Sequence, residues 1–262
     1  MTEQPNDKNN RREEQPTMRE DLLIGRNAVL ELLRSEKPVE SIFLQKEPTG
    51  TLLKIAAIAR ERGIVIKQVN SQKLDFMCAH AVHQGVVAQL AGHAYSELED
   101  IIARAVDEPL FVVLCDGIED PHNLGAIIRS AEAAGAHGLI IPKRRNVGLT
   151  HIVSKASAGA VSHLPVARVA NLAATIDMLK KRGVWVYAAD LKGKSWCETD
   201  FSGPVGLVIG SEGNGVSRLV SEKCDFSVSI PMRGKVSSLN ASVATGIVLF
   251  EIARQRMGIK AV

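Results

Sequence analysis

Aromatic residues are scarce in this sequence, at only 4% of its 262 positions. This scarcity argues against a single-strand binder that stacks bases on rows of aromatic rings. Cysteine is also rare: Cys78, Cys115, Cys197 and Cys224 are scattered without a CxxC pair, the pattern expected of reduced thiols in a cytoplasm. A disulfide-rich or redox-active class therefore has no support.

Long apolar runs are missing as well. Nothing near the N-terminus resembles the apolar stretch of a signal peptide, and the longest apolar candidate, Ala241 to Ala253, contains Glu251. The formal net charge of +3 permits a polyanionic partner without requiring one. With an ordinary hydrophobic share of 45%, these absences predict a soluble cytoplasmic protein that has no membrane partner.

The hydrophobic pattern divides the chain into a tail, a small α/β domain, a connector and a larger α/β domain, at residues 1–20, 21–92, 93–108 and 109–262. The tail is polar and lacks a hydrophobic rhythm, which predicts disorder. In the connector, Ser96 and Glu99 have the spacing of a capping box, which predicts a helix.

The larger domain contains the apolar runs LFVVLCDG, HGLIIP, VWVYAAD and VGLVIG, which stop abruptly at polar or glycine residues. Such runs are typical of strands buried on both faces, so they predict a mostly parallel sheet with helices between the strands. Ligands bind beyond the carboxyl ends of such strands. The loops after Leu114, Ile209 and Ile230 are therefore the candidate site.

The first of these loops leads into the helical pattern PHNLGAIIRSAEAAG. Asn123 is expected to cap this helix, which runs to Gly135. Arg129 points away from the apolar face, and it is either a solvated surface residue or a fixed guanidinium that binds phosphate. His122 is either structural or an acid–base group.

The second loop, SEGNG at residues 211–215, crowds glycines into a turn behind a buried strand. Its G-x-x-G-x-G spacing is neither the dinucleotide fingerprint nor the P-loop. The glycines either make a tight turn only or let backbone groups approach a ligand closely. Glu212 is either a surface residue or the partner of a cation or a basic side chain.

The third loop follows a strand pattern at residues 226–230. A helix is expected to begin near Ser237 or Ser238 and is apolar on nearly all sides through Ala253, so the rest of the domain or a second subunit must cover it. Asn240, placed inside the first turn, is either a cap or network residue or a functional group.

Three motifs carry a family resemblance: DPHNLGAIIRSAEAAGAHGLII, LVIGSEGNGV and IPMRGKVSSLNASVATGIVLFEIARQR. In order and spacing they resemble those of the SpoU (TrmH-type) RNA ribose 2′-O-methyltransferases of the SPOUT class. LIGRNAVLELL and HQGVVAQL resemble, more narrowly, the two-domain type that methylates a guanosine ribose of bacterial 23S rRNA. The resemblance covers all of the chain except the tail.

The resemblance implies a C-terminal parallel-sheet domain with a trefoil knot that binds S-adenosylmethionine (SAM), and a small L30e-like RNA-binding domain. By position, Gly210, Ile230 and Leu239 match the SAM contacts of the family. Arg26 and Asn27 fall in the stretch that matches the RNA-binding domain. The family also implies a homodimer, in which the apolar last helix is buried.

The implied reaction sets demands of its own. A ribose 2′-hydroxyl is a poor nucleophile, so it must lose its proton as it attacks the methyl on sulfur, and the forming alkoxide needs stabilisation. The sulfonium supplies the electrophile, so no metal is required.

Family position places Arg129 at the 2′-hydroxyl, reaching the partner subunit's SAM. It acts there as the base, which is awkward for a guanidinium because that group has no acceptor, or as an orienting and stabilising charge. Asn123, Glu212, Ser238 and Asn240 match the remaining motif positions, as groups that orient Arg129 or the RNA.

Other functions stay open. A tRNA ribose 2′-O-methyltransferase shares the chemistry, and a non-catalytic RNA-binding assembly factor of the ribosome could keep the fold. GSEG is not the nucleophile elbow of a serine hydrolase.

Two short polar segments could have either a functional or an ordinary structural role. CAHAVH offers the ligand types Cys78, His80 and His83 but has no second cluster, so no metal is expected. PKRRN contains Lys143, Arg144 and Arg145, which are either a solvated charge run or a grip for RNA phosphates at a strand end.

Overall fold

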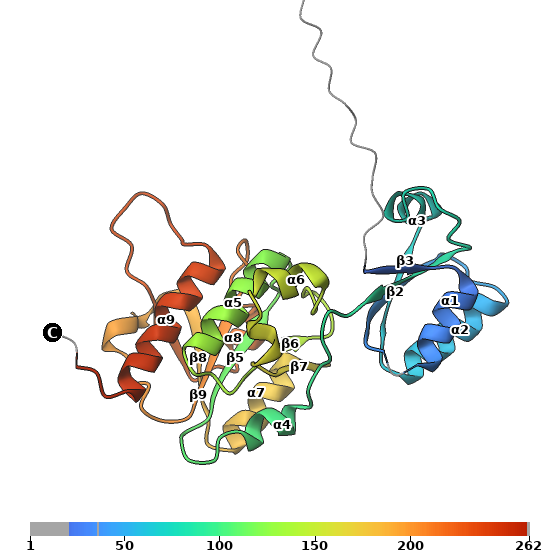
Figure 1. Ribbon diagram of the computed structural model, residues 1–262. Coiled ribbons are helices and arrows are strands. Elements are labelled where there is room, and N and C mark those ends of the chain that lie inside the picture. The colour runs from blue at the N-terminus through green and yellow to red at the C-terminus, as the bar shows by residue number, and fades with distance from the viewer. Residues whose placement is uncertain (1–20, 36, 261–262) are drawn as a thin grey trace, which may run out of the picture. The chain divides into compact units, whose positions relative to one another are not determined.

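The computed structural model describes residues 21–35 and 37–260 (Figure 1). The predicted tail lies outside the described residues. The chain divides into two compact units, residues 1–89 and 90–262. Every helix in the described part is too short or too polar to span a bilayer.

The N-terminal unit is built on a four-stranded sheet in the order β1-β4-β2-β3, in which β1 is antiparallel to β4 and β2 is parallel to β3. Apolar side chains at helical spacing in α1, such as Val29 and Leu33, are buried. Its elements are β1 Leu22–Ile24, α1 Arg26–Arg34, β2 Val39–Gln45, α2 Thr51–Glu61, β3 Val65–Val69, α3 Ser71–Met77 and β4 Val86–Leu90.

The C-terminal unit contains a six-stranded sheet in the order β10-β8-β9-β5-β6-β7, with every neighbouring pair parallel. This confirms the predicted α/β class and parallel sheet. The trefoil knot stays a prediction. The elements are α4 Leu98–Ala103, β5 Phe111–Asp116, α5 Pro121–Ala133, β6 Gly138–Pro142, α6 His151–Ala156, β7 Val166–Val169, α7 Leu172–Lys181, β8 Trp185–Ser195, β9 Val205–Gly210, α8 Arg218–Ser221, β10 Phe226–Ser229 and α9 Ala241–Arg256.

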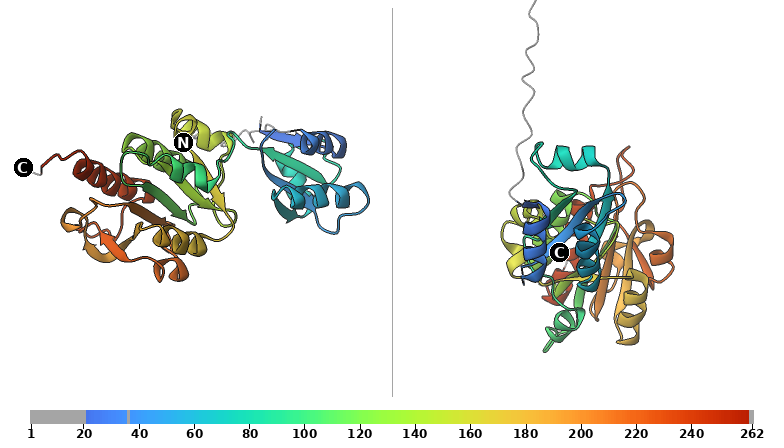
Figure 2. Two further views of the ribbon diagram at one scale, coloured as in Figure 1. Left: turned by 90° about the horizontal axis from the view of Figure 1, so that it is seen from below. Right: turned by 90° about the vertical axis from the view of Figure 1, so that its right-hand side faces the viewer.

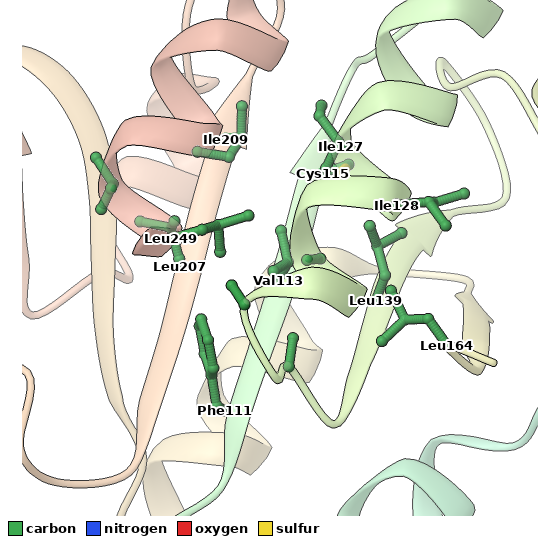
Figure 3. Packing of buried hydrophobic residues seen from close by; sticks show 14 of the residues in the cluster. Phe111, Val113, Cys115, Ile127, Ile128, Leu139, Leu164, Leu207, Ile209 and Leu249 are labelled. Carbon is green, nitrogen blue, oxygen red and sulfur yellow. The ribbon is translucent and has the colours of Figure 1, made fainter. Parts of the chain in front are cut away.

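Both faces of this sheet are covered, which is why its strands are apolar without alternation. Phe111 and Val113 of β5 pack in one core with α5, α6 and α9 (Figure 3), whereas Val112 and Leu114 pack in a second core with α4, α7 and α8. The left view of Figure 2 shows the helical layers on opposite sides of the sheet. Hydrophobic packing on both faces of the sheet therefore fixes the strands whose carboxyl ends carry the candidate loops.

The predicted capping box of the connector is wrong by one residue. Helix α4 is capped by Glu97 and Asp100, whose side chains and backbone N–H groups bond reciprocally. Ser96 instead pairs with β7 in an isolated parallel bridge, so it is extended and leaves Glu99 inside the helix. Strand β7 has no counterpart among the predicted strands because its four residues form no long apolar run.

The predicted starts of the two helices at the candidate site are also wrong. Asp120, not Asn123, caps α5: its carboxylate accepts from the His122 N–H, and Pro121 occupies the first helical position. Helix α9 begins at Ala241, later than the predicted start, because Asn240 is its N-cap. Asn123 is thereby released for other partners.

Candidate functional site

A hollow of about 510 Å³ opens at the carboxyl ends of β9 and β10, beside residues 189–191 in the middle of β8. Its walls include the 211–215 turn, the segment 237–239 and the first half of α9. Gly210, Ile230 and Leu239 all line it. Two of the three loops singled out from the sequence therefore meet at one concave site, as the rule for parallel sheets predicts.

The backbone approaches itself very closely at Gly210. A Cβ there would lie 1.9 Å from the carbonyl carbon of Gly215 and 2.0 Å from the nitrogen of Val216. The Ser211 N–H donates to the Gly215 carbonyl at 3.0 Å, and the Gly215 N–H donates to the Ser211 carbonyl at 2.8 Å. The glycines thus make a tight turn that lines the hollow, and the approach of its backbone to a ligand stays a prediction.

Asn123, Glu212 and Asn240 form one hydrogen-bonded group, here called the Asn–Glu–Asn network. Asn123 Nδ2 donates to Glu212 Oε1. Asn240 Nδ2 donates to Asn123 Oδ1 at 3.0 Å and to Glu212 Oε1 at 3.2 Å. The network joins the start of α5, the 211–215 turn and the start of α9, so it ties all three predicted loops together.

The network also settles what these side chains contact. The carboxylate of Glu212 accepts from two amides rather than from a basic side chain. Asn240 is both a cap and a network residue, since its Oδ1 accepts from the Ser242 and Val243 N–H groups at 2.9 and 3.3 Å. Asn123 is buried, and its Nδ2 would lack an acceptor without Glu212.

A second hollow, of about 430 Å³, lies on the other side of the 211–215 turn. It is lined by the segment 116–120, Asn123, Arg145, Ser217 and the turn itself. Glu212 lines both hollows. The Asn–Glu–Asn network therefore stands at the wall between two adjacent concave sites.

The structure does not bring Arg129 to this wall within one chain. Arg129 is exposed on α5 and lines neither hollow. Among the described residues, its guanidinium makes no hydrogen bond or ion pair. Ser238, by contrast, lines the first hollow from the exposed segment before α9.

The remaining basic candidates lie in different places. Lys143 and Arg144 are exposed after β6, and Arg145 lines the second hollow. In the N-terminal unit, Asn27 is exposed, and the Arg26 N–H and Nε–H donate to the side chain and the carbonyl of Gln84, each at 3.0 Å.

The geometry gives little support to a metal site at CAHAVH or to a nucleophilic cysteine. His83 Nε2 contacts Asp75 Oδ1 at 3.0 Å, and its Nδ1 accepts from the Gly85 N–H, so His83 serves the fold. Within the part of the chain that the structure describes, no three ligand side chains gather into a metal site. Burial raises the pKa of Cys115 and Cys224 to about 12, which makes both poor nucleophiles.

Sequence reasoning missed Asp190, which lines the first hollow. The sequence signal is the polar stop at the end of the apolar run VWVYAAD, although β8 continues beyond Asp190 to Ser195, so Asp190 lies inside the strand and not in a loop after it.

Comparison with known proteins finds a matching family for each of the two units. The SpoU rRNA methylase family matches residues 109–250, and the RNA 2′-O ribose methyltransferase substrate-binding family matches residues 22–96. A relative in Bacillus subtilis, YacO, whose name assigns it to the TrmH family of tRNA/rRNA methyltransferases, is 48% identical over 90% of this chain and 96% of its own.

Solved structures agree. The SpoU methyltransferase AviRb from Streptomyces viridochromogenes, in complex with AdoMet, is similar with a TM-score of 0.59 and 29% identity over 90% of each chain. An AdoMet-bound rRNA methyltransferase from Sinorhizobium meliloti has a TM-score of 0.57 and 29% identity, covering 92% of this chain and 88% of its own. On its motifs, its fold and these relatives, the chain belongs to the SpoU/TrmH family of SAM-dependent RNA methyltransferases.

Proposed function

We propose that this protein transfers a methyl group from SAM to the ribose 2′-hydroxyl of a guanosine in 23S rRNA. The observation that carries the proposal is the Asn–Glu–Asn network, which locks the three motif loops together beside a hollow. The resemblance of the N-terminal stretches to the two-domain 23S rRNA type supports the choice of RNA.

The first hollow fits SAM by size and by donor chemistry. Its volume of about 510 Å³ lies in the usual range of small-molecule sites. The apolar side chains of Ile230 and Leu239 suit an adenine ring, and the turn after Gly210 offers main-chain groups for polar edges. The carboxylates of Asp190 and Glu212 complement the positive charges of the sulfonium and the ammonium. When bound, SAM supplies an electrophilic methyl group.

The residues of the chain then have to guide the hydroxyl. A guanidinium donates hydrogen bonds and accepts none, so we assign Arg129 the role of orienting the RNA and stabilising the forming alkoxide rather than that of a base. Ser238 stands at the rim of the first hollow and orients the incoming ribose. The Asn–Glu–Asn network keeps the two hollows in a fixed position relative to each other during the transfer.

A homodimer would complete the site. Val243, Phe250 and Met257 lie seven residues apart on one face of the C-terminal segment, and their exposed fractions are 52%, 53% and 66%. Such an apolar stripe is typical of an interface. A Cβ on Gly246 of α9 would lie 3.8 Å from the Ser130 hydroxyl, directly beside Arg129 in sequence. A second copy that covers α9 therefore approaches Arg129, which can then act at the partner's SAM.

We assign RNA binding outside the two hollows to Arg26, Asn27, Lys143 and Arg144, whereas Arg145 meets the RNA in the second hollow, which it lines. These side chains are exposed or partly exposed, and the substrate-binding family matches the N-terminal unit. Guanidinium and ammonium groups bind phosphates and position the RNA without reading its sequence. We place the enzyme in the cytoplasm, with its RNA.

Transfer of labelled methyl from SAM to purified 23S rRNA and, in parallel, to bulk tRNA tests the proposal. Label that maps to one 23S guanosine ribose is expected. Label on tRNA alone would favour the tRNA methyltransferase, a candidate that the names of the TrmH relatives also allow. No SAM binding at all would favour the assembly factor.

Arg129→Ala separates chemistry from cofactor binding. We expect it to abolish transfer and to leave the Kd for SAM nearly unchanged, because Arg129 does not line the hollow of its own chain. Arg233→Ala, on the exposed segment before α9 and outside the lining of either hollow, controls for the loss of one positive charge. Turnover by Arg129→Ala comparable to that of the wild type would contradict the assigned role.

A further inference from the structure

The second hollow has a charge pattern that is unusual for an RNA-binding protein. Four carboxylates line it, from Asp116, Glu119, Asp120 and Glu212, against the single guanidinium of Arg145. An excess of negative charge repels phosphates, so an RNA can present only an uncharged part to this hollow. Hydrogen-bond donors on a base or a ribose suit it best.

Three of the carboxylates already have partners. Asp116 accepts from the Ser217 N–H at 2.7 Å, Asp120 accepts from the His122 N–H at 3.0 Å, and Glu212 belongs to the Asn–Glu–Asn network. These contacts fix the walls of the hollow.

Glu119 and Arg145 are different. Within residues 21–35 and 37–260, neither side chain makes a hydrogen bond or an ion pair, with each other or with a third group. The carboxylates also form no metal-binding group among these residues. The hollow therefore presents one free acceptor and one free donor.

The two loops that carry these groups are tied to each other. The Ile118 N–H donates to Asn146 Oδ1 and the Val147 N–H donates to the Ile118 carbonyl, both at 2.8 Å. Arg145 has a left-handed backbone with φ of 59°, a conformation rare for arginine. The two backbone segments that carry Glu119 and Arg145 are therefore tied together before any ligand arrives, which favours selective recognition.

Guanine is the base that uses both groups fully. Its N1–H and N2 amino group are adjacent donors that suit a carboxylate, and its O6 and N7 are adjacent acceptors that suit a bidentate guanidinium. Adenine has neither the N1–H nor the N2 amino group. Pyrimidines have no acceptor that corresponds to N7.

Resting on the proposed function, we propose that the second hollow holds the base of the target nucleotide, where Glu119 accepts from N1–H and N2 and Arg145 donates to O6 and N7. The two residues thereby select guanosine. The ribose of that nucleotide then lies beside the wall that the hollow shares with the SAM site, where Glu212 faces both.

The test uses the full-length protein and an RNA fragment that contains the mapped target. The fragment carries guanosine, inosine or 7-deazaguanosine at that position, and kcat/KM is measured for the wild type, Glu119→Ala, Glu119→Gln and Arg145→Ala. Inosine lacks the N2 amino group, and 7-deazaguanosine lacks N7. Affinity for SAM and thermal unfolding show that each variant is folded.

For the wild type, we expect each analogue to lower kcat/KM by about tenfold, the order of one base contact. In Glu119→Ala and Glu119→Gln, inosine causes little further loss, whereas 7-deazaguanosine still does. Arg145→Ala shows the reverse. Two matched controls are Glu132→Ala on α5 and Arg233→Ala on the segment before α9. Neither residue lines the hollow, so both variants keep both penalties.

Losses that simply add, equal use of inosine and guanosine by the wild type, or a mapped target other than guanosine would overturn the inference and leave the methyltransferase activity standing. Absence of transfer from the wild type to any RNA would overturn the proposed function itself, and the base site with it.

Discussion

Replacing Gly210 with alanine adds one methyl group where the structure has no room for it. The new Cβ would lie 1.9 Å from the carbonyl carbon of Gly215 and 2.0 Å from the nitrogen of Val216. Ordinary contact begins near 3.4 Å, so the 211–215 turn must retreat by about 1.5 Å. The neighbouring atoms belong to the backbone, so no side chain can rotate away.

The cost follows from two effects. Overpacking of this kind costs about 1–3 kcal/mol. The two backbone hydrogen bonds between Ser211 and Gly215 are lost or weakened, at about 1 kcal/mol each. We expect the free energy of unfolding to fall by roughly 3 kcal/mol, which lowers Tm by roughly 6–12 °C for a unit of this size.

Binding should suffer as well, because the displaced turn forms a wall of the first hollow. The assay pairs thermal unfolding with calorimetric titration of SAM. Gly213→Ala is the matched control for stability, since a Cβ there meets nothing within 4 Å in the same turn. If Gly210→Ala kept the Tm and the SAM affinity of the wild type, the argument from backbone approach would be refuted.

Three further predictions concern the network, the dimer and pH. Glu212→Ala leaves the buried amide of Asn123 without its acceptor, so urea unfolding should show a loss of about 1–3 kcal/mol, whereas Glu222→Ala on the surface changes little. Phe250→Glu places a charge on the exposed apolar face of α9 and should halve the mass measured by light scattering; an intact dimer would contradict the interface. Burial lowers the pKa of His137, so the unfolded chain takes up its proton first and stability should decline as pH falls through about 6.5. His137→Gln should flatten that decline in denaturation curves recorded between pH 5 and 8, and an unchanged slope would count against it.

Local patterns in the sequence were sufficient for the α/β class and for two of the loops that line the first hollow. The apolar runs that became β5, β6, β8 and β9 lack alternation because both faces of their sheet are covered, and that is visible without a structure. Local competition decided the helix starts, and there prediction failed. Asp120 and Asn123 both suit an N-cap, but Pro121 fits only the first helical position, which favours Asp120.

The sequence by itself determined which residue types stand at the carboxyl ends of the strands, because periodicity and abrupt polar stops report the burial of each element separately. Only the tertiary structure decided which of these side chains form hydrogen bonds with one another. Asn123 and Glu212 are 89 positions apart, and Asn123 and Asn240 are 117 apart. They meet because β9 lies beside β5 in the sheet while α9 packs beside α5, and no local pattern encodes that strand order. The same order assigned Arg145 to the second hollow and left Arg129 outside both, since neighbours in space are set by the packing of whole elements.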